Sequence, residues 1–193
     1  MTEKRIHVAL AGNPNTGKST VFNALTGSHQ HVGNWPGKTV EKKEGEYSYG
    51  GVDVQVIDLP GTYSLSYYSL EEQIARDYII KNHPDVVVNV VDCSNLERNL
   101  YLTVQILETH TPVILFLNME DQAHVLGYKI DHQELSRRLN GIIVIPGTAS
   151  KYRGIRALQD AILEFTQQNG ISEEPAFATP GNERLLHGSL SSR

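Results

Sequence analysis

The chain has 193 residues, of which 39% are hydrophobic, and it carries 17 Lys and Arg against 22 Asp and Glu, a formal net charge of -5. This length suits one α/β domain with a sizeable core, and the lack of a basic surplus argues against a nucleic-acid-binding surface. The single cysteine, Cys93, excludes an internal disulfide, and the longest apolar runs are only strand-sized. We therefore expect a chain that is soluble by itself and lies in the cytoplasm.

Apolar runs of strand length alternate with segments of helical period along most of the chain. Strands are predicted over residues 6–11, 40–49, 52–57, 85–92, 113–117 and 142–145, with a hairpin turn at Gly50-Gly51. Helices are predicted over 18–27, 69–81, 95–108, 131–139 and 155–165, and Ser69-Leu70-Glu71-Glu72 is a capping box at the start of the second of them. Residues 28–39 follow neither period and are predicted to be a loop. The alternation predicts a doubly wound α/β sheet that is six-stranded and mostly parallel, with ligands at the carboxyl ends of its strands.

The composition changes near the end of the chain. From Asn169 onward, prolines, glycines and serines replace the apolar residues that could be buried in a core. We therefore expect a folded domain over 1–168 and a linker or disordered tail over 169–193.

Residues 12–19, Gly-Asn-Pro-Asn-Thr-Gly-Lys-Ser, follow the first predicted strand and precede the first predicted helix. They match the phosphate-binding P-loop, in which backbone N–H groups and the start of a helix surround phosphate oxygens. Lys18 is expected to reach the β- and γ-phosphates, and Ser19 to bind Mg²⁺. The predicted phosphate-binding residues are Asn13, Pro14, Asn15, Thr16, Gly17, Lys18, Ser19 and Thr20.

Two further motifs stand at the ends of predicted strands. Asp58-Leu59-Pro60-Gly61 offers a carboxylate that would hold Mg²⁺ through water, and a glycine N–H that would meet the γ-phosphate. Asn118-Met119-Glu120-Asp121 matches the guanine-reading motif, in which a carboxylate accepts two hydrogen bonds from the base. Adenine lacks that pair of donors, which disfavours a P-loop ATPase or kinase. Thr148-Ala149-Ser150 lies where a backbone N–H would meet the guanine oxygen.

These motifs, together with Val32-Gly33-Asn34-Trp35-Pro36-Gly37-Lys38-Thr39 and Thr62-Tyr63-Ser64-Leu65, resemble the N-terminal G domain of the FeoB family of prokaryotic ferrous iron transporters. The resemblance covers residues 4–166. It implies a Ras-like P-loop GTPase fold, hydrolysis of GTP to GDP, and a membrane transport domain that follows this one in the family. It also implies a location at the cytoplasmic face of the inner membrane.

The resemblance also assigns roles to residues of the 28–39 loop. It implies that Thr39 closes on Mg²⁺ and the γ-phosphate, with Gly37 and Lys38 beside the nucleotide. The side chain of Asn15 and the backbone of Gly33 and Trp35 would hold K⁺; the alternatives are that Asn15 stabilises the loop and that Trp35 is a packing residue. The residues expected to carry catalysis are then Asn15, Lys18, Thr39 and Gly61.

Two residues depart from the usual GTPase pattern. Thr62 stands where Ras has its water-orienting glutamine, so another group must promote hydrolysis. Met119 replaces the lysine of the common guanine motif, as in FeoB-like sequences, and we expect weaker, faster nucleotide exchange. His29 and His31 lack nearby Cys, Asp or Glu partners and are not assigned as metal ligands.

The predicted function is a Mg²⁺-dependent, K⁺-activated GTPase that regulates ferrous iron transport. The alternative is a GTP-binding switch with negligible turnover that acts through a partner protein. The sequence leaves open whether the chain forms a homo-oligomer.

Overall fold

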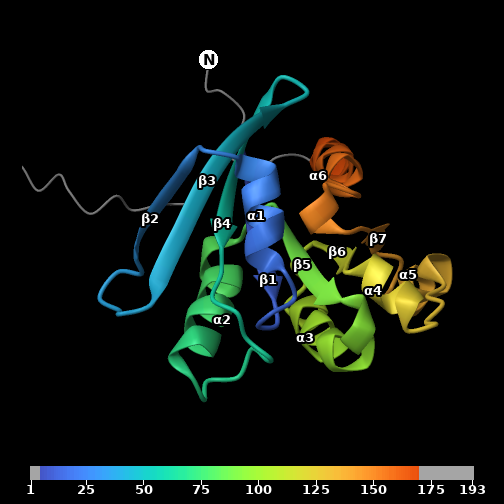
Figure 1. The fold of residues 1–193 in the computed structure, drawn as a ribbon. Helices are drawn as coiled ribbons and strands as arrows, with labels where there is room; N and C mark the ends of the chain where they lie inside the picture. The colour runs from blue at the N-terminus through green and yellow to red at the C-terminus, as the bar shows by residue number, and fades with distance from the viewer. Residues whose placement is uncertain (1–4, 170–193) are drawn as a thin grey trace, which may run out of the picture.

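The strands of the computed structural model, which describes residues 5–169, form one sheet in the order β2-β3-β4-β1-β5-β6-β7 (Figure 1). The strands are β1 Arg5–Gly12, β2 Gln30–Asn34, β3 Glu41–Tyr49, β4 Val52–Asp58, β5 Val86–Asp92, β6 Val113–Asn118 and β7 Ile143–Pro146. The α-helices are α1 Lys18–Thr26, α2 Leu70–Asn82, α3 Leu96–Glu108, α4 Glu120–Val125, α5 His132–Arg138 and α6 Ile155–Asn169. Two short 3₁₀ helices, η1 Cys93–Asn95 and η2 Ala149–Lys151, complete the described elements.

Strand β1 lies at the centre of the sheet, between β4 and β5. It pairs in parallel with β4 and β5, and β6 and β7 continue the parallel series, whereas β3 runs antiparallel to both β2 and β4. The carboxyl ends of β1, β4, β6 and β7 therefore lie at one edge of the sheet. That edge carries the P-loop, the Asp58 turn, the Asn118 motif and the Thr148 segment, so the topology brings the predicted motifs together.

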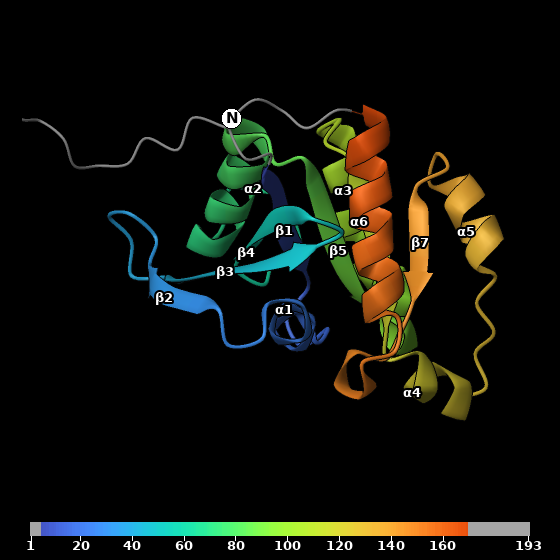
Figure 2. The same ribbon diagram turned by 90° about the horizontal axis from the view of Figure 1, so that it is seen from above.

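Helices cover both faces of the sheet and bury its apolar strands. On one face Phe22 of α1 and Ile162 of α6 pack against β1, β5 and β6. On the other face Ile79 of α2 and Ile106 of α3 form the core. Seen from above, the sheet runs from β2 at one end to β7 at the other, with α5 beyond β7 (Figure 2). Because both faces are covered, β1 and β5 are buried along almost their whole length rather than at alternate positions.

The predicted doubly wound, mostly parallel architecture is confirmed, with two corrections within the described residues. The sheet has seven strands rather than six, because Gln30–Asn34, predicted to lie in a loop, forms the edge strand β2. All five of its residues are exposed, so no hydrophobic alternation marks the strand. The short helix α4 was also not predicted. Residues 170–193 of the predicted tail lie outside the described residues.

Gly45 of β3 packs closely against the end of α1, which generates a stability prediction. A Cβ at Gly45 would lie 2.6 Å from Thr26 Cγ2 of α1 and 3.0 Å from the His29 carbonyl oxygen. We expect Gly45→Ala to lower the free energy of unfolding by about 1 to 3 kcal/mol through overpacking. Gly33→Ala in β2 is the matched control, because the nearest atom to its new Cβ, His31 Nε2, would be 3.9 Å away. Equal melting temperatures for the two variants would contradict this packing.

Candidate functional site

The P-loop takes a backbone path that requires glycine at two positions. Gly17 has φ +82°, and a Cβ there would lie 2.3 Å from the Asn118 side-chain nitrogen; a Cβ at Gly12 would lie 2.5 Å from the Val90 carbonyl oxygen. Asn15 also has a positive φ, 67°. Gly17 precedes α1 and supplies no side-chain cap, so no side chain closes off the first turn of the helix. The loop thus has the form that phosphate binding requires.

The side chain of Asn118 joins three of the segments at this edge. Its Nδ2 donates to the Thr16 carbonyl at 2.8 Å, and its Oδ1 accepts from the Ala149 N–H at 2.9 Å. Asn118 is buried, with 3% of its surface exposed. Asn118 was predicted as a base-binding residue. In this structure its side chain connects the P-loop, β6 and η2 through hydrogen bonds.

Asp121, the predicted guanine acceptor, is partly exposed at the start of α4. Its Oδ2 accepts from Lys151 Nζ at 2.7 Å, and its Oδ1 accepts from the Gln122 N–H at 3.0 Å. The hydrogen bond from Lys151 holds the pKa of the Asp121 carboxyl below its usual range. Met119 of the same motif lies close to the P-loop, because its Cε is 3.5 Å from the position that a Cβ added at Gly17 would take. The motif thus presents an ionised carboxylate beside the P-loop.

Lys18 is bound inside the site rather than extended over the P-loop. Its ammonium group donates to Asp58 Oδ1 and, at 2.6 Å, to the Leu59 carbonyl oxygen. The two charged side chains are 10% and 6% exposed. The predicted phosphate ligand and the predicted Mg²⁺ ligand therefore neutralise each other. Phosphates that attract Lys18 would at the same time free the Asp58 carboxylate.

The predicted γ-phosphate sensor lies against the P-loop. The Thr62 N–H donates to the Gly12 carbonyl at 3.2 Å, and a Cβ at Gly61 would be 3.4 Å from Pro14 Cα. Thr62 is buried, and its hydroxyl donates to the Ser64 carbonyl at 2.7 Å. This hydroxyl is therefore bonded within its own loop, and its part in hydrolysis stays a prediction.

Sequence reasoning missed the carboxylate that organises the segment after Gly61. Ser64 Oγ donates to Glu72 Oε1 at 2.7 Å, Ser66 Oγ donates to Oε2, and the N–H groups of Tyr68 and Ser69 also donate to Oε2. These bonds, that from Ser66 above all, lower the pKa of the Glu72 carboxyl. Glu72 was expected only as the partner of Ser69 in a capping box, so the sequence signal covered one of its four contacts.

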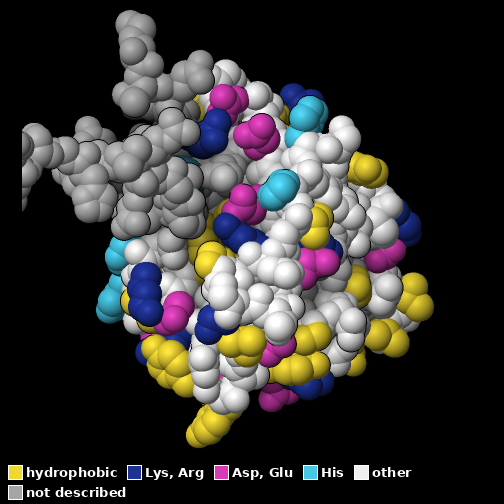
Figure 3. All heavy atoms as spheres, turned by 90° about the vertical axis from the view of Figure 1, so that its left-hand side faces the viewer, with side chains coloured by type: hydrophobic (Ala, Val, Ile, Leu, Met, Phe, Trp, Pro, Cys, Tyr) yellow, Lys and Arg dark blue, Asp and Glu magenta, His cyan; other side chains and the backbone are white. Residues whose placement is uncertain are grey.

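Exposed tyrosines surround the same segment. Tyr68 is 96% exposed, and the guanidinium groups of Arg98 and Arg76 lie 4.3 Å and 4.9 Å from the ring centres of Tyr63 and Tyr67. Figure 3 shows hydrophobic side chains gathered at the lower end of the face that carries β2, where Figure 1 places α2. The stacked arginines each cover one ring, whereas Tyr68 extends into solvent.

The residues expected to bind K⁺ are not brought together. Gly33 lies in β2, three positions from β1 in the sheet, while Asn15 lies in the loop after β1. The Trp35 carbonyl accepts the Lys38 N–H at 2.9 Å, and its indole packs against Tyr78 of α2. Thr39 and Ser19 are both exposed. In this arrangement residues 30–39 belong to the edge of the sheet rather than to the phosphate site.

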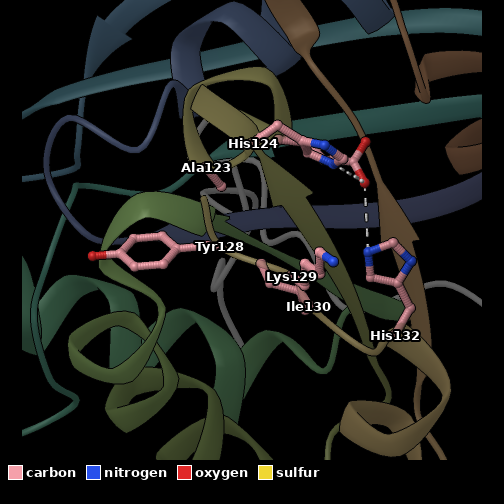
Figure 4. A pocket seen from close by; sticks show the side chains of 7 residues that line it. Ala123, His124, Tyr128, Lys129, Ile130 and His132 are labelled. Carbon is pink, nitrogen blue, oxygen red and sulfur yellow. Dashed lines mark ion pairs between the residues drawn. The ribbon is translucent and has the colours of Figure 1, made fainter. Parts of the chain in front are cut away.

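A hollow of about 210 Å³ lies beside α4, on the outer side of the Asn118 motif (Figure 4). Glu120 Oε1 lies 3.8 Å from His124 Nε2 and 3.5 Å from His132 Nε2.

Within residues 5–169, no group of three or more His, Cys, Asp or Glu side chains is arranged to hold a metal ion. No helix in this described part is both long and apolar enough to cross a bilayer.

The buried pair of Lys18 and Asp58 generates a prediction for the nucleotide-free protein. Asp58→Asn leaves the Lys18 ammonium buried without its counter-charge, and we expect a loss of up to about 3 kcal/mol in stability. Lys18→Met combined with Asp58→Asn removes both charges and should recover part of that loss. Thermal unfolding without nucleotide measures both. A double variant less stable than Asp58→Asn alone would contradict the pairing.

Comparison with known proteins gives a consistent assignment. The family model described as "Ferrous iron transport protein B" matches residues 6–162. The Fe(2+) transporter FeoB of Escherichia coli K12 is 53% identical over 172 residues, which cover 87% of this chain and 22% of that protein. The chain thus spans about a fifth of the length of this relative.

Solved structures agree with this result. The FeoB G domain of Methanococcus jannaschii matches with a TM-score of 0.75 and 48% identity, covering 85% of this chain and 99% of that one. The apo cytosolic domain of T. maritima FeoB matches with a TM-score of 0.82 and 48% identity, covering 88% and 67%. The chain therefore belongs to the ferrous iron transport protein B (FeoB) family, and it has the Ras-like P-loop GTPase fold of that family's G domain.

Proposed function

We propose that this chain binds guanine nucleotides and hydrolyses GTP, and that it regulates ferrous iron passage through a membrane domain. The observation that carries the proposal is the pair of hydrogen bonds from the Asn118 side chain to Thr16 and Ala149. These bonds hold the P-loop and the segment that contains Asp121 at one edge of the sheet. Relatives support it, because T. maritima FeoB cytosolic domains are described in GDP and GMPPNP forms. The domain would work at the cytoplasmic face of the inner membrane, attached to the transport domain.

The base is proposed to be read by Asp121, with the Thr148–Ser150 segment beside it. Guanine offers N1–H and N2–H₂ to a carboxylate, and the ionised state of Asp121 is favoured by its lowered pKa. A polar site left unpaired by the wrong ligand discriminates strongly, by up to about 10⁴-fold.

Base specificity generates a direct prediction. The wild-type chain should bind GTP and GDP but not ATP, and Asp121→Asn should weaken GTP binding and favour xanthosine triphosphate, whose oxygen at position 2 accepts from an amide. Competition titrations with GTP, GDP, ATP and xanthosine triphosphate measure this. Equal wild-type affinities for ATP and GTP would reject guanine recognition.

Ser19, Thr39 and Asp58 are proposed to hold Mg²⁺. Hydroxyl and carboxylate oxygens are the hard donors that this ion takes, and Asp58 becomes available when Lys18 turns to the phosphates. When bound, Mg²⁺ neutralises charge on the β- and γ-phosphates. Thr39 is exposed in the turn after β2, and we expect residues 35–39 to move toward the phosphates when it binds Mg²⁺.

Asn15 is proposed as the residue through which K⁺ promotes hydrolysis. Thr62 is committed to Ser64, and neither the P-loop nor residues 28–39 contain an arginine, so the positive charge for the transition state must come from elsewhere. The Asn15 side chain is exposed at the P-loop and offers an amide oxygen. When bound there, K⁺ supplies positive charge beside the phosphates.

The commitment of the Thr62 hydroxyl also favours the alternative function, a GTP-binding switch with negligible turnover. Phosphate release over several turnovers separates the two. A single equivalent of phosphate, or none, would favour the switch, whereas steady release supports the enzyme.

The rate of hydrolysis in K⁺ and in Na⁺ tests the proposed role of Asn15. At equal ionic strength, hydrolysis should be at least about tenfold faster in KCl than in NaCl, a modest share of the ~10³ to 10⁵ that an arginine finger supplies. Asn15→Ala should abolish the difference while leaving GDP affinity nearly unchanged. If Asn15→Ala keeps full K⁺ stimulation, Asn15 is only a loop residue.

A further inference from the structure

The carboxylate proposed to read guanine is already engaged by a cation from its own chain. Lys151, the last residue of η2, donates to Asp121 Oδ2 at 2.7 Å, while the Gln122 N–H occupies Oδ1. Lys151 directly follows the Thr148–Ser150 segment. An incoming base would therefore meet an ammonium group that already donates to Oδ2.

The exposure of the pair sets the strength of this competition. The Lys151 side chain is 62% exposed and that of Asp121 29%, so water and salt screen their attraction. An exposed ion pair of this kind is weak enough for guanine to displace. It is also close enough for Lys151 to recapture the carboxylate as the base leaves.

We propose that Lys151 is a positioning residue for nucleotide exchange, which competes with guanine for Asp121 and so speeds the release of GDP. This inference rests on the proposed recognition of guanine by Asp121. It assigns the rate of release to an interaction outside the P-loop, at the base.

Removal of Lys151 should leave the surrounding loops in place, because other contacts join them. Asn118 Oδ1 accepts from the Ala149 N–H, and the Glu120 N–H donates to the Gly147 carbonyl at 3.1 Å. Arg153 lies 3.9 Å from the Glu120 carboxylate. None of these contacts involves the Lys151 side chain, so a change in release would report on Asp121 rather than on lost structure.

The experiment measures release of a fluorescent N-methylanthraniloyl GDP from the full chain by stopped flow. Lys151→Met keeps the length of the side chain but removes the donor, and we expect release to slow by about two- to fivefold, the range for an exposed pair. Lys129→Met is the matched control, because Lys129 is exposed on the segment between α4 and α5 and carries the same charge. It should leave release unchanged. Release from Lys151→Met at the wild-type rate or faster would overturn the proposal.

A second background separates this inference from guanine recognition itself. In Asp121→Asn, tested with fluorescent xanthosine diphosphate, the carboxylate is gone and Lys151→Met should no longer alter release. A persistent slowing there would show that Lys151 acts on something other than Asp121, and would also overturn the proposal. If Asp121→Asn still preferred GDP, the proposed recognition of guanine would fail instead.

Discussion

The site depends on one buried amide. Asn118 binds the Thr16 carbonyl with its nitrogen and the Ala149 N–H with its oxygen, so the loops after β1, β6 and β7 are held as one unit. The same side chain occupies the space that a Cβ at Gly17 would need. The P-loop glycine and the asparagine are therefore matched to each other. A buried amide with both ends bonded fixes geometry more firmly than surface contacts can.

The charged side chains of the site pair with one another, one pair buried and one pair at the surface. Lys18 and Asp58 are buried at the phosphate end, whereas Lys151 and Asp121 meet at the surface at the base end. A buried pair is costly to separate unless another charge takes the place of its partner, which phosphates and a cation would do together. A surface pair opens readily. The proposed phosphate end would thus favour all-or-none occupancy, and the proposed base end would allow rapid exchange.

The sequence predicted the parts of the molecule that have a strong period or a fixed spacing. The apolar strands β1 and β5, the Ser69 capping box and the P-loop were located correctly because each follows a local rule. Strand β2 was missed because all of its residues are exposed and its pairing with β3 is a tertiary choice. The partners of Glu72 and Asp121 were missed for a similar reason, since Ser64 and Lys151 come together with them only through folding. The roles of Gly33 and Thr39 stay predictions, since Gly33 pairs with Lys42 in the edge strand and Thr39 is exposed in the turn after it.

Trp35 gives the domain a built-in optical reporter. It is the single tryptophan of the chain and lies within the segment that is proposed to move when Thr39 binds. Its ring is set edge-on to Tyr78, with centroids 5.6 Å apart, and the Lys42 ammonium lies 5.3 Å from its centre. Indole emission responds to the polarity and the charges around the ring. A movement of residues 35–39 toward the phosphates would take the indole away from both neighbours and change its emission. The proposed movement can therefore be followed by the fluorescence of Trp35, without an attached dye.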